Sequence, residues 1–224
     1  VSISKRLSMY VLRAKVEIKC SPEDLNYFLV DKNGIEKLPN NLISIPQNKM
    51  QTTLNHNRSV SLTMLDGPKN YFFVFGDKKE ISKLHNAIYS AEINPCNWND
   101  VHIESIIPNI FNETQDLYIP QSVNLDLIDA INFKKGCYTG QEIVARTHYL
   151  GKPKRRMYLG SVELNKNPEL GSEIKASDEK IGSLVNYYKQ KNDVFRILVE
   201  LRIEKVDAQP TLNGNEILSL KMQY

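Results

Sequence analysis

The chain has 224 residues, of which 41% are hydrophobic and 25% charged, and its formal net charge is +3. This composition is ordinary for a soluble globular protein, and no apolar run approaches the roughly 18 residues that a membrane-spanning helix needs. A charge of +3 is too small to indicate nucleic-acid binding unless a local basic patch is present.

The first half of the chain predicts an α+β layer. Residues 2–10 read as the end of a helix already under way, and the chain begins with Val1, so we expect that a segment preceding it is missing. Alternating or β-branched runs predict strands over 11–18, 26–30, 59–65 and 71–75. A helix is expected over 77–91, with Asp77 as its cap. Turn signals lie at Asn33-Gly34, 38–41 and 66–68.

The middle of the chain is less regular. Residues 95–98 read as a junction, and residues 101–107 are compatible with a strand or a short helix. A short helix is expected over 120–131, because Val123, Leu127 and Ile131 fall on one side.

After Gly151 the pattern changes to short strands. Strands are predicted over 156–164, 180–188, 194–203 and 216–222, and the run Leu212–Asn215 contains the strongest hairpin signal in the chain. Several short strands with little helix favour a small barrel or sandwich, so we expect a domain boundary near Gly151.

Cysteine usage bears on compartment and metal binding. The three cysteines, Cys20, Cys96 and Cys137, are odd in number and form no pair with zinc-ligand spacing. This favours free thiols in a reducing compartment. The four histidines are scattered, so no tightly held metal with only protein ligands is expected.

The run Lys134–Glu142 (KKGCYTGQE) is the densest in chemistry. Thr139 and Glu142 match a capping box, which would place Cys137 in the turn before a helix that ends at Gly151. Free N–H groups there, with Lys134, Lys135 and Arg146, would favour a thiolate or bind an anion. The residues alone leave open a second interpretation, in which the cysteine is a buried small hydrophobe and the lysines are solvated.

A second charged run, Lys152–Arg156 (KPKRR), forms a compact basic patch. Such a run is usually a solvated surface, and the alternative is contact with an anionic partner such as a polyglutamate tail, an RNA or an acidic protein. No RNA-binding motif accompanies it.

The run from Lys135 to Glu142 resembles the signature of the YgfZ family of folate-binding proteins, which is related to the glycine-cleavage T-protein. Further stretches resemble the family along nearly the whole chain. They are Tyr10–Val16, Tyr118–Leu125, Ile143–Arg146 and Lys180–Leu184. The chain departs from the family at Ile106, where related sequences tend to have glycine.

The resemblance implies a T-protein-like fold of several parts around a central channel, ending in a small β-barrel. In these terms, residues 1–94 would be an α+β (ferredoxin-like) part of the folate-binding region, 95–150 a connecting segment with the cysteine motif, and 151–224 the barrel. Family members carry a substantial segment before the region matched by Tyr10–Val16, which agrees with an incomplete N-terminal part.

The resemblance also implies a function. The protein would bind tetrahydrofolate or a derivative and support iron–sulfur cluster assembly or repair, and through it the methylthiolation of tRNA. Its partners would be iron–sulfur proteins or assembly factors, in the cytoplasm or, in a eukaryote, the mitochondrial matrix. Cys137 would be the functional thiol or a cluster ligand shared with a partner, and the folate would contact Lys135, Tyr138, Gln141, Glu142 and Arg146.

Two other functions remain open from the sequence. One is a tetrahydrofolate-dependent aminomethyltransferase of the glycine cleavage system, against which the cysteine motif argues. The other is a non-enzymatic module that docks RNA or protein through the basic patch. An accessory factor is expected in preference to a turnover enzyme.

Overall fold

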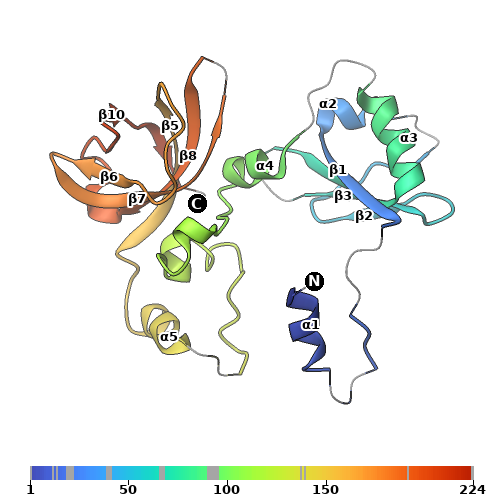
Figure 1. Ribbon diagram of the computed structural model, residues 1–224, viewed down its shortest axis with the longest axis horizontal. Helices are drawn as coiled ribbons and strands as arrows, with labels where there is room; N and C mark the ends of the chain where they lie inside the picture. Colours follow the sequence, from blue (N-terminus) through green and yellow to red (C-terminus); the bar gives the residue numbers. More distant parts are fainter. Residues whose placement is uncertain are drawn as a thin grey trace. The chain divides into compact units, whose positions relative to one another are not determined.

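A computed structural model describes residues 2–11, 13, 15–18, 23–38, 42–65, 69–89, 96–136, 138, 140–190 and 192–222. The chain divides into two compact units, Val1–Cys96 and Asn97–Tyr224. Figure 1 shows a sheet with a helix in the first unit and a curled, barrel-like sheet in the second. The expected α+β class with a C-terminal barrel is therefore confirmed.

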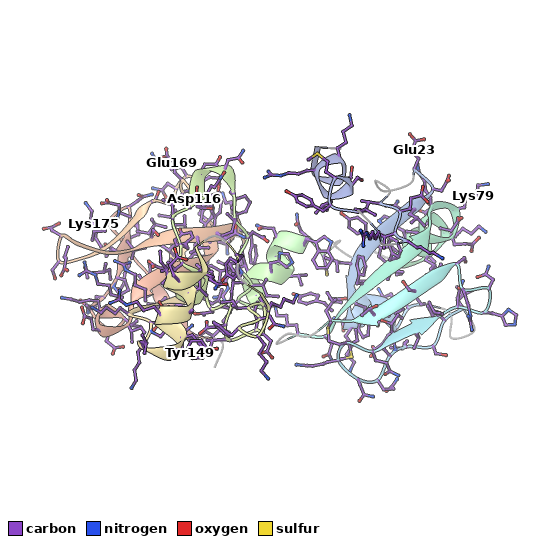
Figure 2. The ribbon with its side chains drawn as sticks, turned by 90° about the horizontal axis from the view of Figure 1, so that it is seen from below. Glu23, Lys79, Asp116, Tyr149, Glu169 and Lys175 are labelled. Atoms are coloured by element: carbon purple, nitrogen blue, oxygen red, sulfur yellow. The ribbon has the colours of Figure 1, made fainter. Side chains whose placement is uncertain are left out.

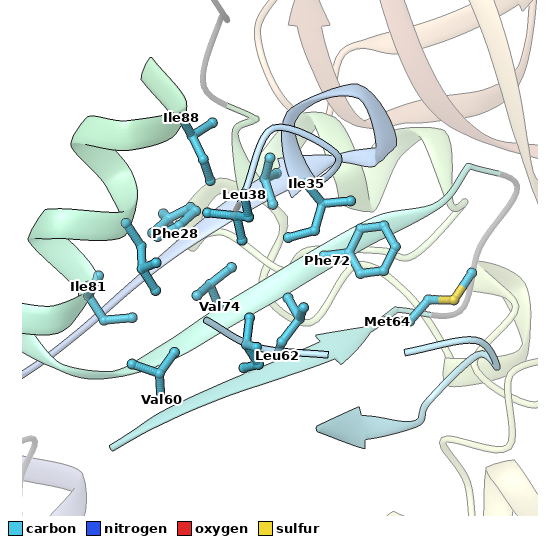
Figure 3. Close-up of a cluster of buried hydrophobic side chains, with 13 residues drawn as sticks. Phe28, Ile35, Leu38, Val60, Leu62, Met64, Phe72, Val74, Ile81 and Ile88 are labelled. Atoms are coloured by element: carbon cyan, nitrogen blue, oxygen red, sulfur yellow. The ribbon is translucent and has the colours of Figure 1, made fainter. Parts of the chain in front are cut away.

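The first unit is built on a four-stranded antiparallel sheet with the order β1-β4-β3-β2. In β3 every second residue is buried, and these residues, with their neighbours on β1 and β4, form the core against α3 (Figure 3). The bounds are β1 Leu25–Asp31, β2 Thr52–Leu54, β3 Val60–Met64, β4 Tyr71–Asp77 and α3 Lys78–Tyr89.

Aspartates begin both helices that follow strands in this sheet. The Lys79 N–H donates to Asp77 Oδ1 at 2.9 Å, which starts α3 where the sequence predicts it. The Gly34 N–H donates to Asp31 Oδ1 at 2.8 Å and starts α2 (Lys32–Ile35). The expected turn at Asn33-Gly34 is thus part of a single helical turn.

Most elements predicted for this unit are confirmed, including a helix at its start, α1 (Ser2–Ser8), and the strands β1, β3 and β4. The strand predicted over 11–18 is wrong, because none of the described residues in this range belongs to a strand. A strand is stabilised by a partner and by burial of one face, whereas Val16 is 59% exposed. The turn signals at 39–41 and 66–68 lie outside the described residues.

The second unit contains a seven-stranded antiparallel sheet with the order β10-β9-β6-β7-β8-β5-β11. β10 also lies against β5, so the sheet is nearly closed around its own core. The strands are β5 Arg155–Glu163, β6 Glu173–Ala176, β7 Glu179–Lys189, β8 Val194–Arg202, β9 Thr211–Leu212, β10 Asn215–Glu216 and β11 Leu218–Lys221.

The predicted hairpin is confirmed. Leu212 pairs with Asn215, and the two residues between them have positive φ values, 52° at Asn213 and 82° at Gly214. These values are typical of the two-residue turn that Asn-Gly favours. The four predicted strands of this region correspond to β5, β7, β8 and the pair β10 and β11, whereas β6 was not predicted.

The segment from Asn97 to Leu150 packs on this sheet and belongs to the same compact unit, which begins at Asn97. The sequence instead suggests a boundary after this segment, near Gly151. Ile103 and Val123 share a buried cluster with Met157, Leu159 and Leu198 of the sheet. The elements of the segment are α4 Trp98–Glu104, η1 Asn112–Thr114, η2 Pro120–Val123 and α5 Gln141–Tyr149.

For this segment the structure contradicts one expectation and decides a second that the sequence leaves open. The helix predicted over 120–131 is wrong, because η2 ends at Val123, where Asn124 adopts a left-handed φ of 62°. The ambiguous range 101–107 is largely helical, since α4 ends at Glu104. Two residues later, Ile106 has a φ of 54°, which explains why glycine suits that position.

Candidate functional site

The candidate site is the cysteine run and the helix that follows it. Cys137 and Thr139 lie outside the described residues, whereas their neighbours Gly136, Tyr138 and Gly140 are described. The geometry of the run therefore rests on these neighbours and on the first turns of α5.

The entry into α5 is a tight turn between Tyr138 and Gln141. The Gln141 N–H donates to the Tyr138 carbonyl at 3.2 Å, and the Tyr138 N–H donates to Gln141 Oε1 at 3.1 Å. Gly140 between them has a φ of 87°, which favours glycine, and is the N-cap of the helix. The predicted capping box, with Thr139 as N-cap, is wrong: the helix begins one residue later, and the Gln141 side chain closes the turn.

The side chains assigned to the site reach solvent. Lys135, Glu142 and Arg146 are exposed, Tyr138 is 52% exposed and Gln141 is partly buried. Since Glu142 and Arg146 are four residues apart in α5, they lie on the same face of the helix. Of the residues that the sequence analysis assigns to folate contact, Gln141 and Glu142 thus lie in the first turn of α5, Arg146 lies in its last turn, and Lys135 and Tyr138 precede it.

Gly136 leaves open space beside the run. A Cβ built on it would meet no heavy atom of the described residues within 4 Å, and Gly136 is not among the described residues with positive φ. Neither packing nor backbone conformation therefore requires a glycine there. The absence of a side chain is compatible with the close approach of a ligand or partner.

One buried contact anchors α5 to the segment before it. Gln121 is 1% exposed, and its Nε2 donates to the Val144 carbonyl at 2.7 Å. Val144 is 6% exposed, while Ile143 and Tyr149 on the same helix are 55% and 65% exposed. Figure 2 labels Tyr149 on this helix. The helix is therefore held by one side, and the other side is available to solvent. Sequence reasoning missed Gln121 as an anchor, although it lies in the stretch that resembles the family.

The electrostatics at the start of α5 favour an anion. The first N–H groups of a helix and its dipole attract negative charge, and Lys134 and Lys135 stand exposed just before it. Within the described part of the chain, no group of three or more His, Cys, Asp and Glu side chains could hold a metal ion.

The basic patch Lys152–Arg156 is less free than its sequence suggests. Arg156 forms a bidentate pair with Asp126, and its Nη2 lies 2.9 Å from Asp126 Oδ2. Arg155 Nη1 lies 2.7 Å from Glu200 Oε2. Two of the four cations are thus neutralised within the unit, which weakens the interpretation of the patch as a docking surface.

Comparison with known proteins gives a consistent set of relatives. The chain is 31% identical over 178 residues to the tRNA-modifying protein YgfZ of Buchnera aphidicola subsp. Schizaphis graminum, an alignment that covers 79% of this chain and 55% of that protein. It is 32% identical over 167 residues to the protein of the same name from Blochmanniella pennsylvanica, covering 72% of this chain and 49% of the relative.

A shorter match is more similar. The YgfZ protein of Aliivibrio fischeri is 40% identical over 119 residues, which is 50% of this chain and 36% of the relative. No protein-family model matches the chain. The chain spans about half the length of the first two relatives. These matches confirm the resemblance derived from the sequence.

Proposed function

The chain belongs to the YgfZ family. We therefore propose that it is a folate-binding accessory protein that supports iron–sulfur cluster assembly or repair. Through that role it supports tRNA modification by methylthiolation, in keeping with the name tRNA-modifying protein that its curated relatives carry. The observation that carries the proposal is the exposed constellation before and along the start of α5, in which the family signature lies.

The residues of this constellation fit the chemistry of tetrahydrofolate. Lys135 and Arg146 are exposed cations that complement its glutamate carboxylates. The exposed ring of Tyr138 suits its flat pterin, and Gln141 and Glu142 add an amide and a carboxylate for the polar edge. Tetrahydrofolate, when bound, supplies the capacity to carry a one-carbon unit. The five side chains bind and orient it beside the thiol.

Cys137 is the functional thiol in this proposal. Its position in the run, before the start of α5 and after two lysines, favours the thiolate. The thiol acts as a nucleophile, as a redox group, or as a cluster ligand shared with a partner. Since iron–sulfur clusters take about four ligands, the last role requires a partner protein or glutathione.

The partners that this function requires are iron–sulfur proteins or their assembly factors, in the cytoplasm or the mitochondrial matrix. Among the described residues, no helix has both the length and the apolar character that crossing a bilayer demands.

Calorimetric titration with tetrahydrofolate tests the ligand assignment. We expect the unchanged protein to bind, and Lys135→Ala and Tyr138→Ala to raise the Kd by about tenfold each. Lys166→Ala removes an exposed lysine that lies outside the sequence motif. This variant serves as the control and should keep the affinity for tetrahydrofolate. Absence of binding heat, or equal affinity in all variants, would overturn the assignment.

A further inference from the structure

A second candidate site lies in the second unit, and its lining includes no described residue of the cysteine run. It is a cleft of about 660 Å³ between the 117–122 segment, the end of α5 with the residues that follow it, and strands β7 and β8. This volume is within the range of roughly 300–1,000 Å³ that small-molecule sites occupy. The function proposed above makes no use of the cleft.

The cleft is cationic at its edge. Lys152, Lys154 and Lys180 line it, and Lys180 Nζ lies 3.1 Å from Glu173 Oε1. Lys152 and Lys154 are exposed, and neither has an ion-pair partner among the described residues. Two ammonium groups are therefore available to a bound anion.

The carboxylate of Glu200 in the cleft does not repel an anion, because it is paired with Arg155. Glu200 is 5% exposed, and Arg155 Nη1 lies 2.7 Å from its Oε2. Burial raises the pKa of Glu200, and the Arg155 guanidinium acts against that rise. The pair is close to neutral as a unit, and it engages the guanidinium that would otherwise recognise a ligand carboxylate in a bidentate manner.

The rest of the lining combines apolar surface with hydroxyl groups. Leu117 and Ile119 are 56% and 38% exposed and form an apolar side with Pro153. The Tyr118 hydroxyl lies 3.1 Å from Ser183 Oγ, which places two hydroxyl groups in the lining. A ligand with a flat, partly apolar body and a compact anionic group matches this combination.

We propose that the cleft binds a nucleoside monophosphate, with the phosphate held by Lys152 and Lys154 and the base against Leu117 and Ile119. Phosphate is favoured over carboxylate because the available cations are lysine point charges, whereas the guanidinium of Arg155 already contacts Glu200 through its Nη1. Free nucleotide and the 5′-phosphorylated end of an RNA carry the same group. The proposal does not depend on folate binding or on Cys137.

Titration of the whole protein with adenosine monophosphate, adenosine and inorganic phosphate tests this. We expect the monophosphate to bind at least about tenfold more tightly than adenosine, and Lys152→Ala and Lys154→Ala to lower its affinity by about tenfold each while adenosine binding is unchanged. Leu117→Ala lowers the affinity for both nucleoside ligands. Lys166→Ala, an equal loss of charge outside the cleft, has no such effect.

Equal affinity for adenosine monophosphate and adenosine, no binding of either, or the same loss in Lys166→Ala as in Lys154→Ala would overturn the proposal. All the substituted side chains are exposed, and thermal unfolding of each variant verifies that the fold is kept. Competition between adenosine monophosphate and a 5′-phosphorylated trinucleotide identifies which of the two carries the phosphate that the cleft binds. If the trinucleotide binds more tightly than adenosine monophosphate and displaces it, the ligand is an RNA end. If the trinucleotide competes more weakly, the ligand is the free nucleotide. Either result supports the cleft as the site.

Discussion

The side chain of Asn124 bonds to both backbone polar groups of Met157. Its Nδ2 donates to the Met157 carbonyl at 2.8 Å, and the Met157 N–H donates to its Oδ1 at 3.2 Å. Both residues are 0% exposed. This clamp attaches the segment that precedes the cysteine run to β5, and thereby fixes the platform on which α5 is held.

Asn124→Ala is therefore expected to be strongly destabilising. It leaves two buried backbone groups of Met157 without partners. It also replaces asparagine, a residue that tolerates left-handed backbone, with alanine at a φ of 62°. We expect a loss of about 3 kcal/mol in the free energy of unfolding, measured by urea denaturation.

Asp129→Ala is the matched control for the clamp, because Asp129 has a similar φ of 54° but is exposed. It should cost about 1 kcal/mol or less. If the two substitutions cost the same, the hydrogen bonds to Met157 contribute nothing and the clamp is not a stabilising feature.

The pair formed by Arg155 and Glu200 predicts a specific pH dependence. Burial raises the pKa of Glu200 above its ordinary value of 4.5. A carboxyl whose pKa is higher in the folded state contributes most to stability below pH 4.5, and this contribution is lost as the pH rises through the raised pKa. The unfolding free energy of the unchanged protein relative to Glu200→Gln should thus fall with rising pH.

Glu179 provides a control of opposite sign. Hydrogen bonds from Lys205 and Arg202 lower its pKa below 4.5, so its contribution is present above pH 4.5 and is lost as the pH falls. Urea denaturation of Glu200→Gln and Glu179→Gln across this range should give opposite slopes. A difference for Glu200→Gln that grows with pH would mean that Arg155 outweighs burial.

Gly136→Ala separates function from stability. Because no heavy atom in the described part of the chain lies within 4 Å of the added Cβ, the unfolding free energy should change by less than about 0.5 kcal/mol. If a ligand or partner approaches the run closely, tetrahydrofolate affinity or in vivo activity should nevertheless fall.

Gly151→Ala is the comparison for that variant, since its Cβ would meet only ordinary contacts at 3.7 Å or more after the end of α5. Both variants should keep their stability, and only Gly136→Ala should lose function. Full function in Gly136→Ala would show that the open space beside the run is not used.

Local patterns predict the elements that depend on local physics. Alternation along Val60–Met64 and the Asn213-Gly214 turn identify a strand and a hairpin, because one buried face and two positive φ values suffice to define them. The same alternation fails over 11–18, where no partner strand among the described residues pairs with the segment.

Long-range contacts explain what the sequence could not predict. The helix expected over 120–131 ends at Val123, where the next residue, Asn124, bonds through its side chain to Met157, more than thirty residues away. The partners of Arg155 and Arg156 are Glu200 and Asp126, so a run that reads as a free basic patch is half neutralised. For the site, the sequence identified the exposed residues of α5 but not their anchor, Gln121.

In the proposed function, Cys137 is the functional thiol of an accessory factor for tRNA methylthiolation, and a complementation experiment tests this role most directly. The protein at its native length, unchanged or as Cys137→Ser, is expressed in a bacterial strain that lacks its own YgfZ, and methylthiolated nucleosides of tRNA are quantified by mass spectrometry. Cys96→Ser, a substitution of a thiol outside the run, is the control. We predict that the unchanged protein and Cys96→Ser restore the modification and that Cys137→Ser does not. Full restoration by Cys137→Ser would show that this thiol is not required for the modification.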